Sequence, residues 1–376
     1  MRPGRLALLL PGGVALLGGL NGALLLLGVS APVGAERLAD RHGVIMVLGF
    51  LGTVIALERA VALRATWGYL APGLLGAGGL ALVSPLAPVL GTLLLMNGAL
   101  ALVAVYAALH RRTRDAGVLV QLLAAVLAAC AAGLLLFTET AALVPWLAGF
   151  VVLTIAAERV ELARLALPRG APEALLGFAS ALVGTLILAL TVPEIGTRAY
   201  GLVLLLLALW LARHDVARRM IRTSGLPRLS AAAMLTGYAW LTVAALTWLI
   251  AGVPRTTAVY DTVIHSVFLG FGISMVIAHV AVILPAVLGI RLPYHPALWL
   301  PLSVLHVGMV VRIGLGNGAG IPTAMTAGSI VTVEALLVHV LTVLGLARRG
   351  RRESRPATKA VTRATSDIDT EPRVDA

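Results

Sequence analysis

The sequence predicts an all-α membrane protein, a polytopic helical bundle of about 12 transmembrane helices. Of its 376 residues, 59% are hydrophobic and only 12% are charged, whereas soluble domains carry about 25% charged residues. Its apolar runs last for about 20 residues, the length that crosses ~30 Å of hydrocarbon at ~1.5 Å per residue. The sequence lacks the alternation of apolar and polar residues that marks the strands of a membrane barrel, so helices must cross the bilayer.

Polar connections divide the apolar runs into 12 expected spans within one transmembrane domain, residues 1–347. The first run follows Arg2 and Arg5 and resembles a signal peptide, but it is longer than the apolar core of about 7–15 residues in such peptides, so we expect a retained helix. Residues 348–376 are mostly polar and are expected to form a disordered cytoplasmic tail. The spans are expected at 6–29, 43–63, 68–84, 87–109, 116–137, 141–163, 172–192, 197–213, 229–252, 260–284, 296–314 and 322–347.

The basic residues alternate from side to side along the chain. With a cytoplasmic N-terminus, most of the 29 Lys and Arg residues fall on the cytoplasmic side, as the positive-inside rule requires. The net charge of +12 is therefore mainly a topology signal and does not indicate nucleic-acid binding. We expect a multi-pass protein of the cell (inner) membrane with both termini in the cytoplasm. The basic residues expected on the outer side are Arg37, Arg41, Arg198, Arg255 and Arg312.

Two of the expected spans, 43–63 and 141–163, carry a sequence repeat at a constant offset of 100 residues. A Gly-Phe pair and a later Glu-Arg pair are identical in both spans. Because the chain has only 6 phenylalanines, the shared Gly-Phe pair argues for a true repeat rather than a similarity of composition. The identical positions are Gly49/Gly149, Phe50/Phe150, Ile55/Ile155, Ala56/Ala156, Glu58/Glu158, Arg59/Arg159 and Arg64/Arg164.

A third, weaker copy lies in the span at 260–284. Gly270-Phe271 is followed by His279 at the position where the other copies have glutamate. The three copies are the second, sixth and tenth spans, so each is the second helix of a four-helix module. Parallel repeats of this kind predict a pseudo-threefold bundle about an axis along the membrane normal. The modules are expected at about 1–115, 116–225 and 226–347.

Ionisable residues inside membrane spans are costly and therefore mark candidate functional sites. His42 and His265 lie near the outer ends of the second and tenth expected spans. His42 precedes Gly49 by seven residues and His265 precedes Gly270 by five, so their depths differ by about 3 Å. Two imidazoles on facing helices can be the axial ligands of a haem iron, and nearby glycines let a flat cofactor or a neighbouring helix approach. Each histidine alone is equally well explained as a capping or interfacial residue.

The second expected span contains the pattern His-x3-Met-x2-Gly-Phe, formed by His42, Met46, Gly49 and Phe50. This pattern resembles the second-helix motif of the NnrS family of membrane haem–copper proteins, and His265 with Gly270 is similar to that family's second histidine helix. More distantly, the chain resembles the core subunit I of haem–copper oxidases, with three four-helix arcs and low-spin haem histidines on the second and tenth helices. The resemblance implies a low-spin, bis-histidine haem and a redox or nitric-oxide-related role. The haem would be bound by His42 and His265, beside Met46, Gly49 and Gly270.

Copper, which the resemblance also implies, has less support in the residues. The oxidases carry copper-binding histidines on their sixth and seventh helices, where this chain has none, and Val44 stands where the NnrS pattern has a second histidine. The single cysteine, Cys130, excludes a cysteine-ligated zinc or iron–sulfur cluster. A complete oxygen-reducing centre is therefore not expected, and it stays open whether the protein is an enzyme.

A second set of ionisable residues lies in the cytoplasmic half of the expected bundle. Carboxylates and imidazoles there can relay protons or bind a second metal. They can also pair with neighbouring arginines or form a satisfied hydrogen-bonded network. The candidate proton path consists of Glu58, Glu158, Glu334 and His339. The candidate second metal site consists of His279 and His306.

These observations leave three classes of function. The first is an integral membrane haem protein, with an electron donor or a small gaseous ligand as its partner. The second is a proton-coupled secondary transporter or channel that uses Glu58, Glu158, His279 and Glu334. The third is a membrane scaffold without a cofactor. The lipid bilayer is a partner in all three, nucleic acid in none, and the sequence does not indicate the oligomeric state.

Overall fold

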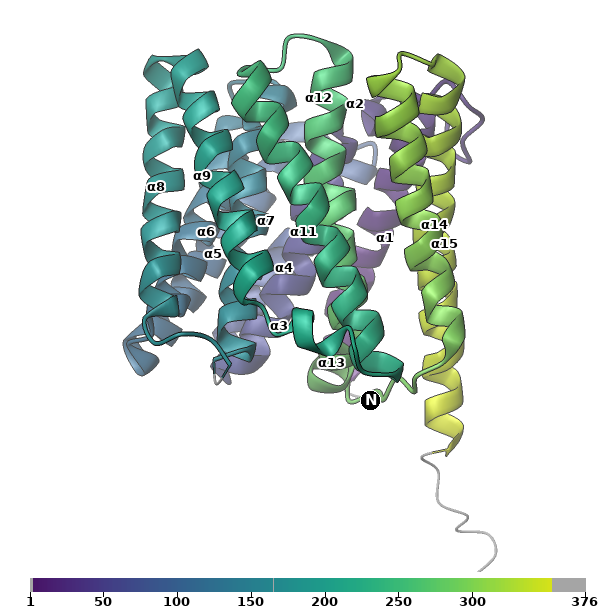
Figure 1. Ribbon diagram of the computed structural model, residues 1–376. Coiled ribbons are helices and arrows are strands. Elements are labelled where there is room, and N and C mark those ends of the chain that lie inside the picture. The colour runs from purple at the N-terminus through teal and green to yellow at the C-terminus, as the bar shows by residue number, and fades with distance from the viewer. Residues whose placement is uncertain (1–2, 165, 354–376) are drawn as a thin grey trace, which may run out of the picture.

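A computed structural model shows a bundle of long helices that run side by side (Figure 1). The structure describes residues 3–164 and 166–353. Within these ranges, 12 helical stretches are long and apolar enough to cross a membrane, and no strand occurs. The predicted fold class, an all-α membrane bundle, is therefore confirmed.

Several spans consist of more than one helical segment. The α-helices are α1 (Pro3–Leu26), α2 (Glu36–Val44), α3 (Thr53–Leu63), α4 (Leu70–Val83), α5 (Pro88–Thr113), α6 (Ala116–Leu134), α7 (Thr140–Leu162), α8 (Ala171–Thr191), α9 (Pro193–His214), α10 (Ala217–Met220), α11 (Gly225–Ala251), α12 (Thr257–His265), α13 (Ser274–Leu288), α14 (Trp299–Met309) and α15 (Pro322–Glu353). The 3₁₀ turns are η2 (Thr66–Tyr69) and η4 (Pro296–Leu298), and the π-helical segments are η1 (Ile45–Gly52), η3 (Ser266–Ile273) and η5 (Val310–Gly318).

The helix ends follow local sequence signals. Proline begins α5 and α9, where its missing N–H costs no hydrogen bond and its fixed φ suits the first helical turn. Asp115 caps α6 because its Oδ1 accepts a hydrogen bond of 2.7 Å from the N–H of Gly117. Inside the bilayer every backbone polar group needs a partner within its own segment, which is why the apolar runs are helical throughout.

The two spans that carry His42 and His265 each contain a π-helical segment directly after the histidine region. η1 joins α2 to α3, and η3 joins α12 to α13. The widened turn is supported in the same way in both, because the hydroxyls of Thr53 and Ser274 donate to the carbonyl oxygens of Gly49 and Gly270, four residues earlier, at 2.6 Å. π-Helical turns are rare and are frequent at functional sites.

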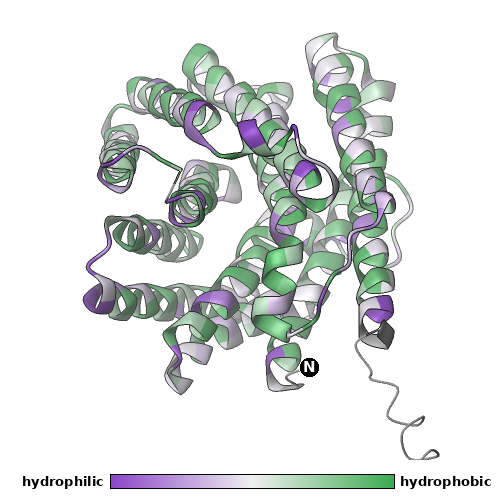
Figure 2. Cartoon of the chain, turned by 60° about the horizontal axis from the view of Figure 1, so that its bottom comes forward, coloured by the Kyte–Doolittle hydropathy of each residue, from purple (hydrophilic) through white to green (hydrophobic). Residues whose placement is uncertain are grey.

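Neighbouring spans form most of the packing. α4, α5, α6 and α7 pack in sequence order, α9 packs between α8 and α11, and α14 packs on α15. The spans with the repeated Gly-Phe pairs lie inside the bundle, since more than half of the most apolar stretch of each is buried. Hydrophobic residues predominate along the helices (Figure 2), and many large apolar side chains are exposed, as a lipid-facing surface requires.

The structure moves several predicted boundaries outward, including those of the two spans that carry His42 and His265. The second span begins at Glu36 rather than 43, and the tenth begins at Thr257 rather than 260. Charged residues form the first turn of α2, so hydropathy alone places the start of the span too late in the sequence. One of these residues, Arg37, donates hydrogen bonds to the carbonyl oxygens of Val83 and Ser84. His42 therefore lies six residues inside its span, about 9 Å along the helix, and not at its outer end.

Two further expectations concern the modules and the tail. α15 continues to Glu353, so the first residues assigned to a disordered tail are helical, and 354–376 lie outside the described residues. Gly149-Phe150 lies in the regular α-helix α7, unlike the π-helical Gly-Phe pairs of the other two copies. The arrangement in three modules stays a prediction.

Candidate functional site

A cavity of about 270 Å³ lies in the half of the bundle away from the N-terminus. Its walls come from α1, α2 with η1, α7, α12 with η3, η5 and α15. The volume is just below the range of ~300–1,000 Å³ that small-molecule sites occupy. The walls are mostly apolar, and their large side chains include Leu20, Phe50, Leu147, Phe268 and Leu336.

His42 and His265 both line this cavity. Nδ1 of His42 lies 3.0 Å from the carbonyl oxygen of Ala39, and Nδ1 of His265 lies 3.0 Å from the carbonyl oxygen of Asp261. A carbonyl oxygen only accepts, so Nδ1 carries the proton in both neutral rings and Nε2 carries the lone pair. Neither Nε2 has a hydrogen-bond partner within the described residues. The cavity thus has two imidazoles with free lone pairs, which is what ligation of a metal requires.

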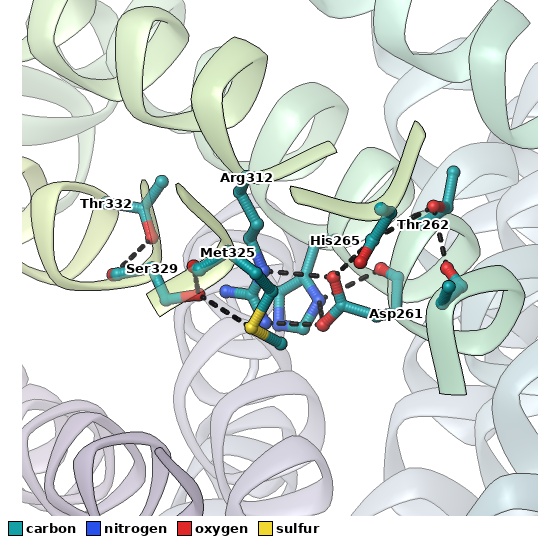
Figure 3. A network of polar contacts seen from close by, with 9 residues as sticks. Asp261, Thr262, His265, Arg312, Met325, Ser329 and Thr332 are labelled. Carbon is teal, nitrogen blue, oxygen red and sulfur yellow. Dashed lines mark hydrogen bonds and ion pairs between the residues drawn. The ribbon is translucent and has the colours of Figure 1, made fainter. Parts of the chain in front are cut away.

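A buried carboxylate holds His265 in place. Oδ1 of Asp261 lies 3.0 Å from Nδ1 of His265. Arg312 donates from Nη2 to Oδ1 at 2.5 Å and from Nε to Oδ2 at 3.1 Å, and Asn317 donates to Oδ2 at 2.8 Å. Figure 3 shows the contacts of Asp261 with both His265 and Arg312. A carboxylate behind a histidine fixes the tautomer and orientation of the ring and raises its basicity as a ligand.

Asp261 and Asn317 were not among the residues that the sequence singled out, and Arg312 counted there as a residue of the outer side. The structure places Arg312 inside the bundle on η5, with 8% of its surface exposed. The spacing of Asp261 and His265 was a usable signal, because residues four apart lie on one helix face. The pairing of Asp261 with Arg312 carries no such signal, since 51 residues separate them.

Of the other residues predicted beside the haem, only Met46 lines the cavity. A Cβ added at Gly49 would lie 3.0 Å from Cα of Gly79, and one added at Gly270 would lie 2.5 Å from Cβ of Trp240. Both glycines therefore allow a close approach of neighbouring helices, α4 and α11. This is the second of the two roles that their position suggested.

The predicted proton-path residues Glu58 and Glu158 meet at one arginine in the half of the bundle near the N-terminus. Nη2 of Arg59 lies 2.5 Å from Oε1 of Glu58 and 3.6 Å from Oε1 of Glu158. Its Nη1 lies 3.4 Å from Oε2 of Glu161. Glu58 thus pairs with its own neighbour, as the local alternative expected, whereas Glu158 pairs with the arginine of the other repeat copy.

Arg159 is engaged by a second carboxylate instead. Its Nε and Nη2 each donate to Asp215 at 3.0 Å, and its Nη1 lies 3.1 Å from Nε2 of His279. The hydroxyl of Tyr238 donates to Oδ2 of Asp215 at 2.6 Å. His279 has its Nδ1 2.7 Å from the carbonyl oxygen of Met275, so both ring nitrogens are engaged and Nε2 accepts from Arg159.

The two contacts between copies follow the same pattern. Arg59 of the first copy contacts Glu158 of the second, and Arg159 of the second contacts His279 of the third. A helix of one copy therefore presents its arginine to the same position on the next. This succession is what the predicted three-module arrangement would require.

The remaining predicted residues lie apart from these clusters. Nδ1 of His306 accepts a hydrogen bond of 3.0 Å from the indole N–H of Trp240, and its Nε2 lies 2.8 Å from the hydroxyl of Thr236, so both ring nitrogens are engaged. Glu334 is exposed on α15, while His339 is buried with no partner for Nδ1 among the described residues. No group of three or more His, Cys, Asp and Glu side chains in the described ranges is arranged to hold a metal ion.

Comparison with known proteins identifies a family. The model of a family described as Domain of unknown function (DUF8744) matches residues 5–348. No curated protein and no solved structure matches the chain. Because the matched residues extend from α1 into the last turns of α15, the chain belongs to the family of the Domain of unknown function (DUF8744).

Proposed function

We propose that this chain is an integral membrane haem-binding protein, similar to the NnrS family, with a redox or nitric-oxide-related role. The observation that carries the proposal is the pair His42 and His265, which line one apolar cavity from two different spans with both Nε2 atoms free. Bis-histidine ligation of haem needs two such nitrogens, one for each axial bond.

The chemistry of the cavity fits this cofactor. Its apolar walls match the face of a macrocycle, and the flexible side chain of Met46 can adapt to an irregular shape. Asp261 accepts the Nδ1–H of His265, an arrangement typical of metal-binding histidines. Copper is not part of the proposal, because the ring nitrogens of His279 and His306 are engaged by other side chains or by carbonyl oxygens.

Each residue of the site would have a distinct role. His42 and His265 would hold the iron, Asp261 would keep Nε2 of His265 deprotonated, and Arg312 offsets the charge of Asp261. A bound haem would supply one-electron transfer and could bind a small gas such as nitric oxide. The apolar walls would exclude water from it.

The visible spectrum of the purified protein tests the proposal. We expect a strong Soret band with low-spin character. His42→Ala and His265→Ala should each give a high-spin spectrum or substoichiometric haem, since each removes one axial bond. His110→Ala and His214→Ala are the controls, because these histidines lie near the C-terminal ends of α5 and α9 and do not line the cavity. The proposal is falsified if both cavity variants keep the wild-type low-spin spectrum at full occupancy.

Proton-coupled transport is the second candidate function. The observation that favours it is the cluster of Glu58 and Glu158 around Arg59, with the buried hydroxyl of Tyr106 left without a hydrogen-bond partner in the described chain. A carboxylate cluster inside a span is a typical element of proton paths. The same purification separates the candidates, because a well-folded protein that stays colourless when haem is supplied supports transport and not haem binding.

We further infer that the protein lies in the cell membrane with both termini in the cytoplasm. The excess of arginine on the face that carries the N-terminus supports this orientation. Reporter fusions after Arg114 and after Thr223 should therefore be cytoplasmic, and one after Pro254 should be external. Opposite results at two of these three sites would invert or replace the 12-span topology.

A further inference from the structure

A concave, strongly basic surface lies at the C-terminal end of α9, on the face of the bundle that carries the N-terminus. We call it the basic pocket, with a volume of about 410 Å³. It is formed by the end of α9, the short helix α10 and the turn that leads toward α11. Its lining consists of Arg213, His214, Asp215, Arg218, Arg219 and Arg222.

The four arginines of the basic pocket carry no compensating carboxylate. All four are exposed, and none forms an ion pair within the described residues. Their one internal hydrogen bond runs from Nη1 of Arg218 to the carbonyl oxygen of Arg213 at 3.1 Å. Four guanidinium groups that share one concavity repel each other unless an anion binds between them.

Asp215 is the only acid in the lining, and it is already fully engaged. Its Oδ1 accepts from Arg159 at 3.0 Å and from the N–H of Ala217 at 2.8 Å, and its Oδ2 accepts from Arg159 at 3.0 Å and from Tyr238 at 2.6 Å. With 5% of its surface exposed, it faces the interior. The carboxylate therefore shapes the turn and leaves the pocket positively charged.

We propose that the basic pocket binds a phosphate-bearing anion. The planar fork of the guanidinium group matches the oxygens of a phosphate in a bidentate way. The pocket begins at the last residue of a membrane span, with Trp210 one turn earlier, so it lies at the level of lipid headgroups. The phosphate of an anionic lipid and soluble phosphate share this chemistry. This binding site is independent of the haem proposal.

The general excess of basic residues on this face is the competing explanation, and the chain offers a matched control for it. Arg218→Gln/Arg219→Gln/Arg222→Gln removes three charges from the basic pocket. Arg111→Gln/Arg348→Gln/Arg349→Gln removes three exposed charges at the ends of α5 and α15, outside the pocket and equally without ion pairs in the described chain. Surface charge alone predicts the same loss in both variants.

The experiment uses the full chain, delipidated in neutral detergent. Native mass spectrometry measures binding of phosphatidylglycerol and of phosphatidylcholine, and the shift in melting temperature with sodium phosphate against sodium chloride measures soluble phosphate. We expect preferential binding of phosphatidylglycerol, of phosphate, or of both, at least about tenfold weaker in the pocket variant and nearly unchanged in the control variant. Binding of the lipid only, or of phosphate only, supports the proposal and identifies the source of the anion.

Two results would overturn the proposal. One is the absence of any preference for phosphatidylglycerol over phosphatidylcholine together with no specific effect of phosphate. The other is an equal loss in the pocket and control variants, which would assign binding to the charge of the whole face. If the triple variant does not fold, Arg219→Gln replaces it, with Arg111→Gln as its control.

Discussion

Replacing Asp261 with asparagine is expected to lower the free energy of unfolding by about 3–5 kcal/mol, because it leaves the buried guanidinium of Arg312 without its countercharge. The side chains of Asp261 and Arg312 are 8% and 9% exposed, so solvent does little to screen the unpaired charge. The variant also replaces the charged acceptor that lies 3.0 Å from Nδ1 of His265 with a neutral amide. Unfolding in mixed detergent micelles measures the change.

The matched control is the double variant Asp261→Asn/Arg312→Gln. Removing both charges leaves no uncompensated ion, so the double variant should be more stable than Asp261→Asn alone. Residues in direct contact are expected to show such non-additivity. A double variant whose loss equals the sum of the two single losses would show that the pair is not energetically coupled.

Asp215→Asn should have a loss of similar size, about 3–5 kcal/mol, at neutral pH. Asp215 and Arg159 are 5% and 6% exposed and form a two-pronged ion pair. The exposed pair of Arg164 with Asp115 is the reference, since Arg164→Gln should cost only about 0–1 kcal/mol. Equal losses in the two variants would contradict the assignment of Asp215 as a buried structural countercharge.

The effect of Asp215 should also depend on pH. Burial alone would raise the pKa of this carboxyl, but hydrogen bonds from Arg159, Tyr238 and Ala217 hold the pKa below its ordinary value. A carboxyl group whose pKa is lower in the folded state stabilises the protein above its pKa in the unfolded state, which is about 3.9. That stabilisation is lost as the pH falls through the pKa of the folded state. The difference in melting temperature between wild type and Asp215→Asn should therefore narrow below about pH 4. A constant difference from pH 7 to pH 3 would contradict this titration.

The twelve spans could be predicted from the sequence because hydropathy and helix length determine them almost alone. The boundary of the second span was less predictable, since Glu36 and Arg37 belong to the helix but resemble a loop in composition. The depth of His42 was misjudged for the same reason. The π-helical segments have no compositional signal, because an apolar run such as Ile45–Gly52 would equally suit a regular α-helix inside a membrane.

The candidate site was predictable only in part. Two related helices with histidines at similar depth indicated that His42 and His265 could converge, and the structure brings both to one cavity. The partners that hold the site together come from distant segments, as Arg312 does for Asp261. Periodicity on one helix carries no information about such tertiary contacts, so glycines such as Gly49 could not be assigned to a cofactor or to a helix partner from the sequence.

The arginine contacts between repeat copies do not continue from the third copy to the first. Val280 follows His279 where Arg59 and Arg159 follow the glutamates of the first two copies, so the third copy offers no cation to the first. Within the described chain, the contact between α13 and α3 is apolar instead, because Leu57 packs in one cluster with Val287 and Leu288. Acid weakens ionic contacts but leaves hydrophobic ones largely intact, whereas salt screens buried ion pairs only slightly. Low pH should therefore loosen the contacts of Arg59 and Arg159 between copies before the apolar contact of α13 with α3.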